Sequence, residues 1–143
     1  MDSLGDILIV PFEAAKYAQA RGLWERTPGM GISGADGEEE IGRFLGKNPG
    51  LSFAALDGER LIGTALCGSD GRRGYLYHLA VDPAFRRRGI GHRLTERCLA
   101  ALKAVGIQKC HLFVISDNES GIDFWTRAGW DERDDIIVFS RSL

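Results

Sequence analysis

Between residues 75 and 115 the hydrophobic pattern changes its period twice, and this change limits the possible folds more than any other feature. Residues 75–81, YLYHLAV, form a short apolar run typical of a strand. Apolar residues then recur at helical spacing from Ile90 and stop before Gly106. Residues 108–115, QKCHLFVI, again have the composition of a strand. A strand, a helix and a strand in this order predict a right-handed β-α-β unit with two parallel neighbouring strands.

Three short strands are expected before the helix of this unit. They lie at residues 51–56, 60–68 and 75–81, and turns at Asp57-Gly58 and Asp70-Gly71 separate them. Asp-Gly is favoured in tight hairpins because glycine adopts positive φ angles without steric cost. We therefore expect an antiparallel three-stranded meander.

The flanking segments complete a mixed sheet with helices on its faces. The other elements are expected as a strand at 6–12, a helix at 13–26, a helix between Asp36 and the KNPG turn at 47–50, a short helix within 116–130 and a last strand at 135–143. Asp36 and Glu39 have the spacing of a capping box at the start of the second helix. The expected fold is a mixed α/β sheet of order β-α-α-β-β-β-α-β-α-β.

Length and charge narrow the class of protein. The 143 residues fit one domain, 1–143, with an ordinary hydrophobic core. The 18 basic and 20 acidic residues leave a net charge of −2, which disfavours a broadly basic surface for nucleic acid. No apolar run approaches the ~20 residues that span a bilayer. The acidic start MDSLGDILIV does not resemble a signal peptide, so we expect a cytoplasmic protein without membrane partners.

The stretch AFRRRGIGHRL, residues 84–94, places three arginines and two glycines at the start of the expected helix. Without Cβ atoms, Gly89 and Gly91 let a ligand oxygen approach the backbone. The first amides of a helix lack intrahelical acceptors, and the helix dipole is positive there. Arginines add charge-assisted hydrogen bonds. The stretch predicts a site for a small anion such as phosphate, without the third glycine of a dinucleotide fingerprint or the Lys-Ser/Thr of a P-loop.

The longer sequence LAVDPAFRRRGIGHRL resembles the acetyl-coenzyme A signature of the GNAT superfamily of N-acetyltransferases. In that family a strand is followed by Arg/Gln-x-x-Gly-x-Gly/Ala, a pattern that Arg86, Gly89 and Gly91 match. A second family motif is similar to the segment that carries Asn118, Gly121, Phe124-Trp125 and Gly129-Trp130. The resemblance covers essentially the whole chain and looks most like a branch of bacterial GNAT proteins whose substrates are mostly unassigned.

This resemblance implies where acetyl-coenzyme A would bind. The amides from Arg87 to His92 would hold the pyrophosphate, and the backbone of Leu79 and Val81 would pair with the pantetheine arm like another strand. The implied coenzyme-binding residues are Leu79, Ala80, Val81, Arg86, Arg87, Arg88, Gly89, Ile90, Gly91, His92, Asn118 and Trp125. No histidine or cysteine spacing indicates a metal site, and the three cysteines are expected as buried thiols.

The residues that handle the amine's proton are less clearly marked. In GNAT relatives a base lies two or four residues before the position of Leu79, which here are Tyr77 and Tyr75. A tyrosine with a pKa of about 10 is a poor base, so Tyr77 is expected to order a relay water. Strand alternation places Tyr75, Tyr77, Leu79 and Val81 on one face and points His78 away, unless a bulge reverses the parity. We expect His78 as a buried, hydrogen-bonded histidine, with catalysis as its alternative.

Two family positions depart from the usual catalytic residues. Phe113 stands where some relatives carry a glutamate base, and Trp125 stands where many carry a tyrosine that protonates the departing coenzyme A. An indole is not a usable proton source, so the acid role is unfilled. For Trp125, packing of a short helix is the alternative to a coenzyme contact.

The resemblance implies an enzyme that moves the acetyl group of acetyl-coenzyme A to a primary amine by direct attack in a ternary complex. The acceptor could be a small molecule or a peptide amine, and the protein a monomer or homodimer. Glu38, Glu39 and Glu40 are expected as a solvated helix start, with attraction of cationic amines as the alternative. A coenzyme A-binding sensor or interaction module that lost catalysis remains the alternative function.

Overall fold

The computed structural model describes residues 6–143, which divide into two units, residues 6–113 and residues 114–143. The first unit contains a five-stranded sheet with the strand order β1-β2-β3-β4-β5. The strands are β1 (Ile7–Pro11), β2 (Phe53–Asp57), β3 (Arg60–Ser69), β4 (Gly74–Val81) and β5 (Cys110–Leu112). The pairs from β1 to β4 are antiparallel and β4 pairs with β5 in parallel. The predicted mixed sheet with a meander and a parallel pair is therefore confirmed.

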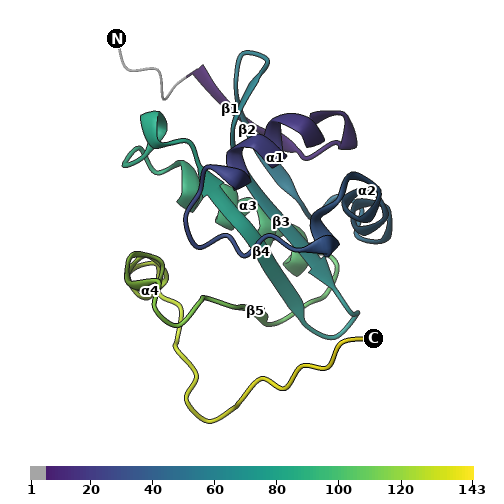
Figure 1. Ribbon diagram of the computed structural model, residues 1–143, viewed down its shortest axis with the longest axis vertical. Coiled ribbons are helices and arrows are strands. Elements are labelled where there is room, and N and C mark those ends of the chain that lie inside the picture. The colour runs from purple at the N-terminus through teal and green to yellow at the C-terminus, as the bar shows by residue number, and fades with distance from the viewer. Residues whose placement is uncertain (1–5) are drawn as a thin grey trace. The chain divides into compact units, whose positions relative to one another are not determined.

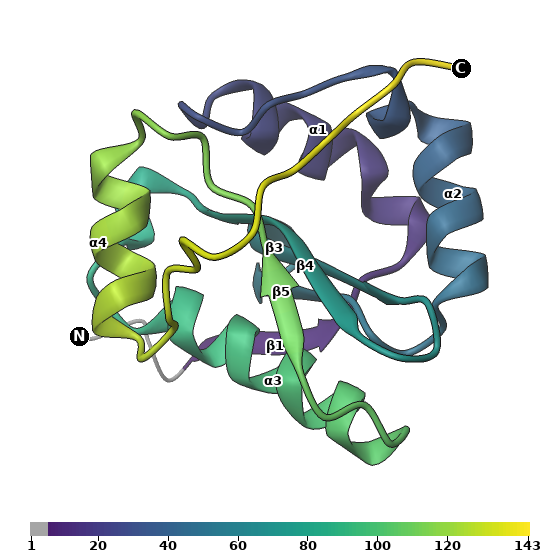
Figure 2. The same cartoon turned by 90° about the horizontal axis from the view of Figure 1, so that it is seen from below.

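Helices cover both faces of this sheet (Figures 1 and 2). The first unit contains α1 (Tyr17–Glu25), α2 (Glu38–Lys47), α3 (Ile90–Ala104) and the short 3₁₀ turns η2 (Ala14–Lys16), η3 (Gly34–Asp36) and η4 (Pro83–Phe85). Two glycines of β3 show which helix lies on which face. A Cβ at Gly63 would lie 3.1 Å from Leu94 of α3, and one at Gly68 would lie 2.9 Å from Phe44 of α2. Because these glycines have opposite strand parity, α3 packs on one face and α2 on the other.

The core between α1 and the sheet is built around Trp24, which is fully buried. Its ring stacks on Phe12 with 6.4 Å between ring centroids. Its indole N–H donates to the hydroxyl of Thr64 at 2.9 Å, and that hydroxyl donates to the carbonyl of His78 at 2.8 Å. A buried polar group costs free energy unless it is paired, so this chain of hydrogen bonds fixes α1 against β3 and β4 in one register.

The turns of the meander follow the sequence prediction. Gly58 and Gly71 have φ angles of 62° and 91°, which only glycine adopts freely. In the second turn the carboxylate of Asp70 accepts from the backbone N–H groups of Arg72 and Arg73, at 2.8 and 2.9 Å. The hydrogen bond from the Arg73 N–H, followed by that from Arg72, lowers the pKa of Asp70. The two Asp-Gly turns predicted from local chemistry are thus confirmed.

The predicted capping box at Asp36 and Glu39 is wrong, because the box lies three residues earlier. Ser33 and Asp36 form it: the Ser33 hydroxyl accepts from Ala35 N–H, and the Asp36 carboxylate accepts from Ser33 N–H at 2.9 Å. The N-cap of α2 is Gly37, which has no side chain to cap the helix. Asp36 therefore ends a 3₁₀ turn, which leaves one carboxylate oxygen available for a distant partner.

The C-terminal unit also differs from the prediction. It contains one helix, α4 (Glu119–Arg127), as expected. The strand expected at 135–143 is not formed, and the strand expected at 108–115 is shortened to Cys110–Leu112. Apolar composition favours a strand only where another strand supplies its hydrogen-bond ladder, and composition does not reveal whether one does. Within residues 6–143 no helix is long and apolar enough to cross a membrane.

The thiols give a direct test of this packing. All three cysteines are free; Cys67 and Cys98 are buried, but Cys110 is only partly buried, so the expectation of three buried thiols is wrong for Cys110. Contact with the Cys110 thiol lowers the pKa of Cys67, but contact with Cys98 and burial outweigh it and raise that pKa to about 12. Contact with Cys67, then burial, raises the pKa of Cys110 as well. Because only thiolates react rapidly, we expect the native protein to resist a disulfide reagent at pH 8.

In urea above the unfolding transition all three thiols should react at the rate of free cysteine. The labelled thiols are counted by absorbance and by mass. Rapid labelling of Cys67 in the native protein would contradict the packing of β3 against α3.

Candidate functional site

Strand β4 contains one more residue than the stretch of β3 that it pairs with. Thr64 lies opposite Ala80, and Leu66 lies opposite Tyr77. Two residues of β4, His78 and Leu79, therefore share the place opposite a single residue of β3, which defines a β-bulge. His78 has a φ angle of 50°, a left-handed conformation that costs a non-glycine residue about 1 kcal/mol. Bulges of this kind re-aim side chains at the point where they occur.

The bulge makes the alternation predicted for β4 wrong. Tyr77 lies edge-on to Phe44 of α2, with 6.2 Å between centroids, and His78 lies edge-on to Trp24 of α1, at 4.8 Å. Both side chains thus face the helices α1 and α2, although they are consecutive in sequence. Beyond the bulge, Ala80 belongs to the same buried cluster as Trp24. Leu79 and Val81 therefore do not share the face of Tyr77, and His78 does not point away from it.

One edge of β4 is open beyond the bulge. The ladder between β4 and β5 joins Gly74 to Cys110, Tyr75 to His111 and Leu76 to Leu112. In the part of the chain that the structure describes, no strand pairs with residues 77–81 along this edge. The guanidinium of Arg86 donates to the carbonyl of Val81 at 3.1 Å. Leu79, Ala80 and Val81 lie on this unpaired part of β4, where the Val81 carbonyl is engaged by Arg86, and their contact with a coenzyme stays a prediction.

The N-terminus of α3 follows η4 directly after β4. Gly89 is the N-cap with a φ angle of 76°, and Arg87 has a φ angle of 63°. The first helical bond runs from Arg93 N–H to the Gly89 carbonyl, so the N–H groups of Ile90, Gly91 and His92 precede the intrahelical ladder. A Cβ at Gly89 would meet nothing within 4 Å. Glycine is therefore required there by backbone conformation, and the space beside it is open to a ligand.

Positive charge dominates this helix start. Arg86, Arg87 and Arg88 are exposed, and the Arg88 guanidinium lies over the Phe85 ring at 5.4 Å. The carboxylate of Asp82, which is buried just before η4, lies 3.4 Å from Arg26 and 3.2 Å from Arg60. Its charge is thus compensated before it can offset the arginines. Backbone N–H groups, a helix dipole and exposed guanidinium groups together suit an anionic ligand.

The two tyrosines of β4 lie in different surroundings. Tyr75 is beside His111 of β5, with 5.8 Å between ring centroids, and Tyr77 is the first residue beyond the β4–β5 ladder. Burial, and then the neighbouring Tyr75, raise the pKa of Tyr77. The Tyr77 phenol thus keeps its proton to a more alkaline pH than a tyrosine in water. It can donate or accept a hydrogen bond, but near neutral pH it forms the basic phenolate even less often than an ordinary tyrosine does.

The partner of His78 was not predicted from the sequence. The imidazole Nε2 lies 2.8 Å from Oδ1 of Asp36, and both side chains are almost completely buried. The Asp36 backbone carbonyl accepts from the Tyr17 hydroxyl at 2.6 Å and from Arg21 at 3.1 Å. No local pattern marks this pair, because the residues are 42 positions apart. The one available signal was an aspartate in a loop between the first two helices, and it was assigned to a cap.

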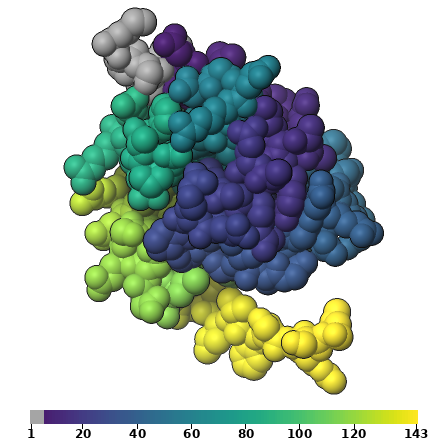
Figure 3. Space-filling model, turned by 45° about the horizontal axis from the view of Figure 1, so that its top comes forward, coloured from purple at the N-terminus to yellow at the C-terminus, as the bar shows by residue number. Residues whose placement is uncertain are grey.

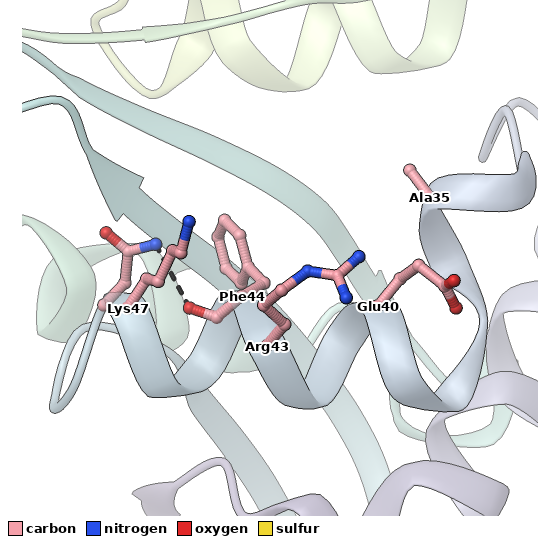
Figure 4. Close-up of a pocket in the computed structure, with 6 residues that line it drawn as sticks. Ala35, Glu40, Arg43, Phe44 and Lys47 are labelled. Carbon is pink, nitrogen blue, oxygen red and sulfur yellow. Dashed lines mark hydrogen bonds between the residues drawn. The ribbon is translucent and has the colours of Figure 1, made fainter.

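A groove of about 330 Å³ runs along α2, on the face of the sheet that Tyr77 and His78 point to (Figure 4). It is lined by Ala35, Glu40, Arg43, Phe44, Lys47 and Asn48. In Figure 4 the Arg43 guanidinium extends toward Glu40, and Asn48 donates to the Phe44 carbonyl at 3.1 Å. The groove presents one carboxylate and two cationic side chains. In Figure 3 the segment between α1 and α2, residues 26–37 in dark blue, lies on the surface beside the purple α1.

Two predicted site residues belong to the second unit. The Asn118 side chain caps α4 by accepting from Gly121 N–H at 3.1 Å. The Trp125 ring lies edge-on to Phe124 and to Trp130, at 4.9 and 5.2 Å. Both residues thus have defined local packing roles. Their contact with a coenzyme remains a prediction from sequence. Within residues 6–143 no group of three or more histidine, cysteine or acidic side chains could hold a metal ion.

Comparisons with known proteins extend this description. The profile of the acetyltransferase (GNAT) family matches residues 14–130. An acetyltransferase of Photorhabdus laumondii is 34% identical over 133 residues, which cover 92% of each chain. The structure is similar to an aminoglycoside acetyltransferase from an uncultured soil metagenomic sample in complex with sisomicin, with a TM-score of 0.81, 19% identity and 99% coverage of both chains. It is also similar to the PaiA N-acetyltransferase of Thermoplasma acidophilum in complex with coenzyme A, with a TM-score of 0.77, 20% identity and coverage of 91% and 92%.

Proposed function

Because the chain belongs to the GNAT family of acetyltransferases, we propose that it transfers the acetyl group of acetyl-coenzyme A to a primary amine by direct attack in a ternary complex. The single observation that supports this best is the sequence of three features along the chain. An open strand edge at residues 77–81 is followed by η4 and then by the arginine-rich start of α3. The strand edge supplies unpaired backbone groups, and the start of α3 supplies a site for an anion. Both could bind one elongated molecule that carries phosphate groups.

The residues present fit acetyl-coenzyme A, which supplies the acetyl thioester when bound. The amides from Arg87 to His92 would bind its pyrophosphate, and Arg86, Arg87 and Arg88 would add positive charge at the rim. The backbone of Leu79 and Val81 would pair with the pantetheine arm. Backbone N–H groups in this part of β4 would polarise the thioester carbonyl. The coenzyme is thus held mainly by backbone groups.

The amine approaches from the face of α1 and α2. Phe44 lines the groove along α2 and also contacts Tyr77 of β4, which supports an approach of the amine along this groove toward β4. Tyr77 orders a water that relays the amine's proton. Tyr75, two residues earlier on β4, is the second candidate for this role. The groove carries both Glu40 and the cations Arg43 and Lys47. It therefore suits an amine that is not itself a dense polycation.

The alternative function is a coenzyme A-binding sensor that has lost catalysis, motivated by Trp125 and Phe113 at two catalytic family positions. An amine panel separates the two functions. It should contain amino acids, polyamines, aminoglycosides and peptide N-termini, with release of free thiol as the measured signal. Turnover on any amine excludes the sensor, whereas tight coenzyme binding without turnover on the panel supports it.

We expect acetyl-coenzyme A to bind the purified protein with a Kd in roughly the micromolar range, about −8 kcal/mol. Adenosine 3′,5′-bisphosphate should compete. Gly89→Trp should weaken binding about 100-fold, because the indole would fill the open space beside the α3 amides. Isothermal titration calorimetry measures both effects.

The matched control is Gly106→Trp at the other end of α3. Gly106 also has a positive φ angle, 89°, with nothing within 4 Å of its Cβ position. Both variants carry the same backbone strain, about 1 kcal/mol, but only Gly89→Trp should lose the coenzyme. Equal affinities in the two variants would show that the coenzyme does not bind at the start of α3.

Tyr77→Phe should lower kcat about tenfold and leave the KM for acetyl-coenzyme A within a factor of two, because it removes one hydrogen-bonding group from the relay. Steady-state kinetics with the best amine of the panel measure the change. Tyr75→Phe tests whether the second phenol belongs to the relay. We expect a smaller loss of kcat than for Tyr77→Phe, because Tyr75 is paired with His111 in the β4–β5 ladder. A Tyr77→Phe enzyme with wild-type kcat would remove Tyr77 from the mechanism.

A further inference from the structure

The buried pair of His78 and Asp36 has no part in coenzyme binding, yet it lies at the bulge where the amine must react. We infer that His78 accepts the amine's proton through Nδ1, and that Asp36 is the positioning residue that fixes the imidazole in the required tautomer. This inference rests on the proposed acetyl transfer. It identifies the proton acceptor that the sequence left open among Tyr75, Tyr77, His78 and water.

The geometry of the pair fixes the tautomer. Nε2 of His78 lies 2.8 Å from Oδ1 of Asp36, and Oδ2 of Asp36 accepts from Ser33 N–H at 2.9 Å. A carboxylate is an acceptor only, so the imidazole must donate from Nε2. A neutral imidazole that carries its proton on Nε2 has its lone pair on Nδ1. The same logic holds the histidine of a serine protease in its reactive tautomer, with the two ring nitrogens exchanged.

Nδ1 is the free end of this pair. It forms no hydrogen bond with any residue in the described range 6–143. Every fully buried side-chain nitrogen or oxygen of the partly or fully buried described residues has a hydrogen-bond partner. Nδ1 therefore does not belong to the fully buried atoms and keeps some access to the surface. A lone pair that is accessible while the rest of the ring is packed is the arrangement that a general base requires.

The backbone conformation supports a role beyond packing. His78 is one of two non-glycine residues with a positive φ angle in the described chain, and the other, Arg87, lies at the proposed phosphate site. A strained residue persists only where its surroundings hold it, and here Thr64 holds the His78 carbonyl while Asp36 holds the ring. A histidine needed only to fill space could occupy an unstrained strand position.

The groups that face this imidazole come from every element packed against it. Asp36 reaches it from η3, and Trp24 lies against it from α1. Tyr17 and Arg21 of α1 contact the backbone carbonyl of Asp36, and Tyr77 is its neighbour on the same face of β4. Among these, Asp36 is the single carboxylate in contact with the ring. It stabilises the imidazolium that forms when Nδ1 takes a proton.

The proton and electron balance is complete without another reactant. The amine lone pair forms a bond to the thioester carbonyl carbon, the carbon–sulfur bond breaks, and its electron pair leaves with the thiolate. The proton released by the amine passes to Nδ1 of His78, directly or through the water that Tyr77 orders. His78 then returns it to solvent or to the thiolate.

The decisive variant is Asp36→Asn, which keeps the shape of the side chain. Its amide would donate to Nε2 and move the imidazole proton to Nδ1, which then has no lone pair. We expect kcat to fall about 100-fold, within the range of lost general-base catalysis, with the KM for acetyl-coenzyme A unchanged. Nitrogen NMR of the labelled imidazole should show Nε2–H in the wild type and Nδ1–H in the variant.

Two further variants separate catalysis from folding. His78→Ala should lose at least as much kcat as Asp36→Asn and recover part of it when imidazole is added, which a purely structural role would not allow. Ser33→Ala loosens the same loop but leaves the Asp36 carboxylate in place. It should lower thermal stability slightly and leave kcat within a factor of two.

The outcomes distinguish this inference from the proposed function. Turnover by the wild type with an unchanged kcat in Asp36→Asn would overturn the role of the pair and leave the acetyltransferase intact. An Nδ1–H tautomer in the wild type would overturn it as well. Coenzyme binding without turnover on any amine would overturn the proposed function, and the catalytic role of His78 with it.

Discussion

His78 and Leu79 of β4 stand opposite the single residue Ala65 of β3, and the arrangement of the site follows from this extra residue. A bulge bends its strand and interrupts its ladder. On one edge, β4 continues past the last pair with β5, so its backbone can bind another chain-like molecule. On its face, two consecutive side chains point toward α1 and α2. A regular strand would alternate its side chains and could not direct both Tyr77 and His78 toward α1 and α2.

The interactions that hold the bulge are side-chain hydrogen bonds, which local sequence does not reveal. Thr64 accepts from Trp24 and donates to the His78 carbonyl, so one buried hydroxyl joins a helix to the irregular point of the sheet. Replacing it with an apolar residue would leave two buried polar groups without partners. The strain at His78 is therefore compensated by contacts from β3, α1 and η3 together. The segment between α1 and α2 therefore contributes Asp36 to the proposed site, although it lies far from β4 in sequence.

Much of the fold could be predicted because local chemistry determines it. The Asp-Gly turns and the change of period after residue 81 place β2, β3, β4 and α3 within a few residues of their observed bounds. The start of α3 was also found, since glycine before a helix has a mechanical cause in a positive φ angle. The role of Asp36 could not be found in this way. Its partner is tertiary, and its sequence neighbours fit a helix cap equally well. The strand expected at 135–143 failed for a related reason, because a strand also needs a partner.

The two halves of the proposed site use different parts of the chain's chemistry. The coenzyme half is formed by backbone amides, a strand edge and a helix dipole, so it depends on backbone conformation at Arg87 and Gly89 more than on any functional side chain. The amine half is formed by side chains of α1, η3, α2 and one face of β4. Changes in the α1–α2 segment can therefore alter the amine that is accepted, or the handling of its proton, without disturbing the coenzyme. The motif at the start of α3 reflects backbone conformation, so a single sequence is enough to identify the cosubstrate. The amine side combines side chains that are far apart in the sequence, so its acceptor must be found by experiment.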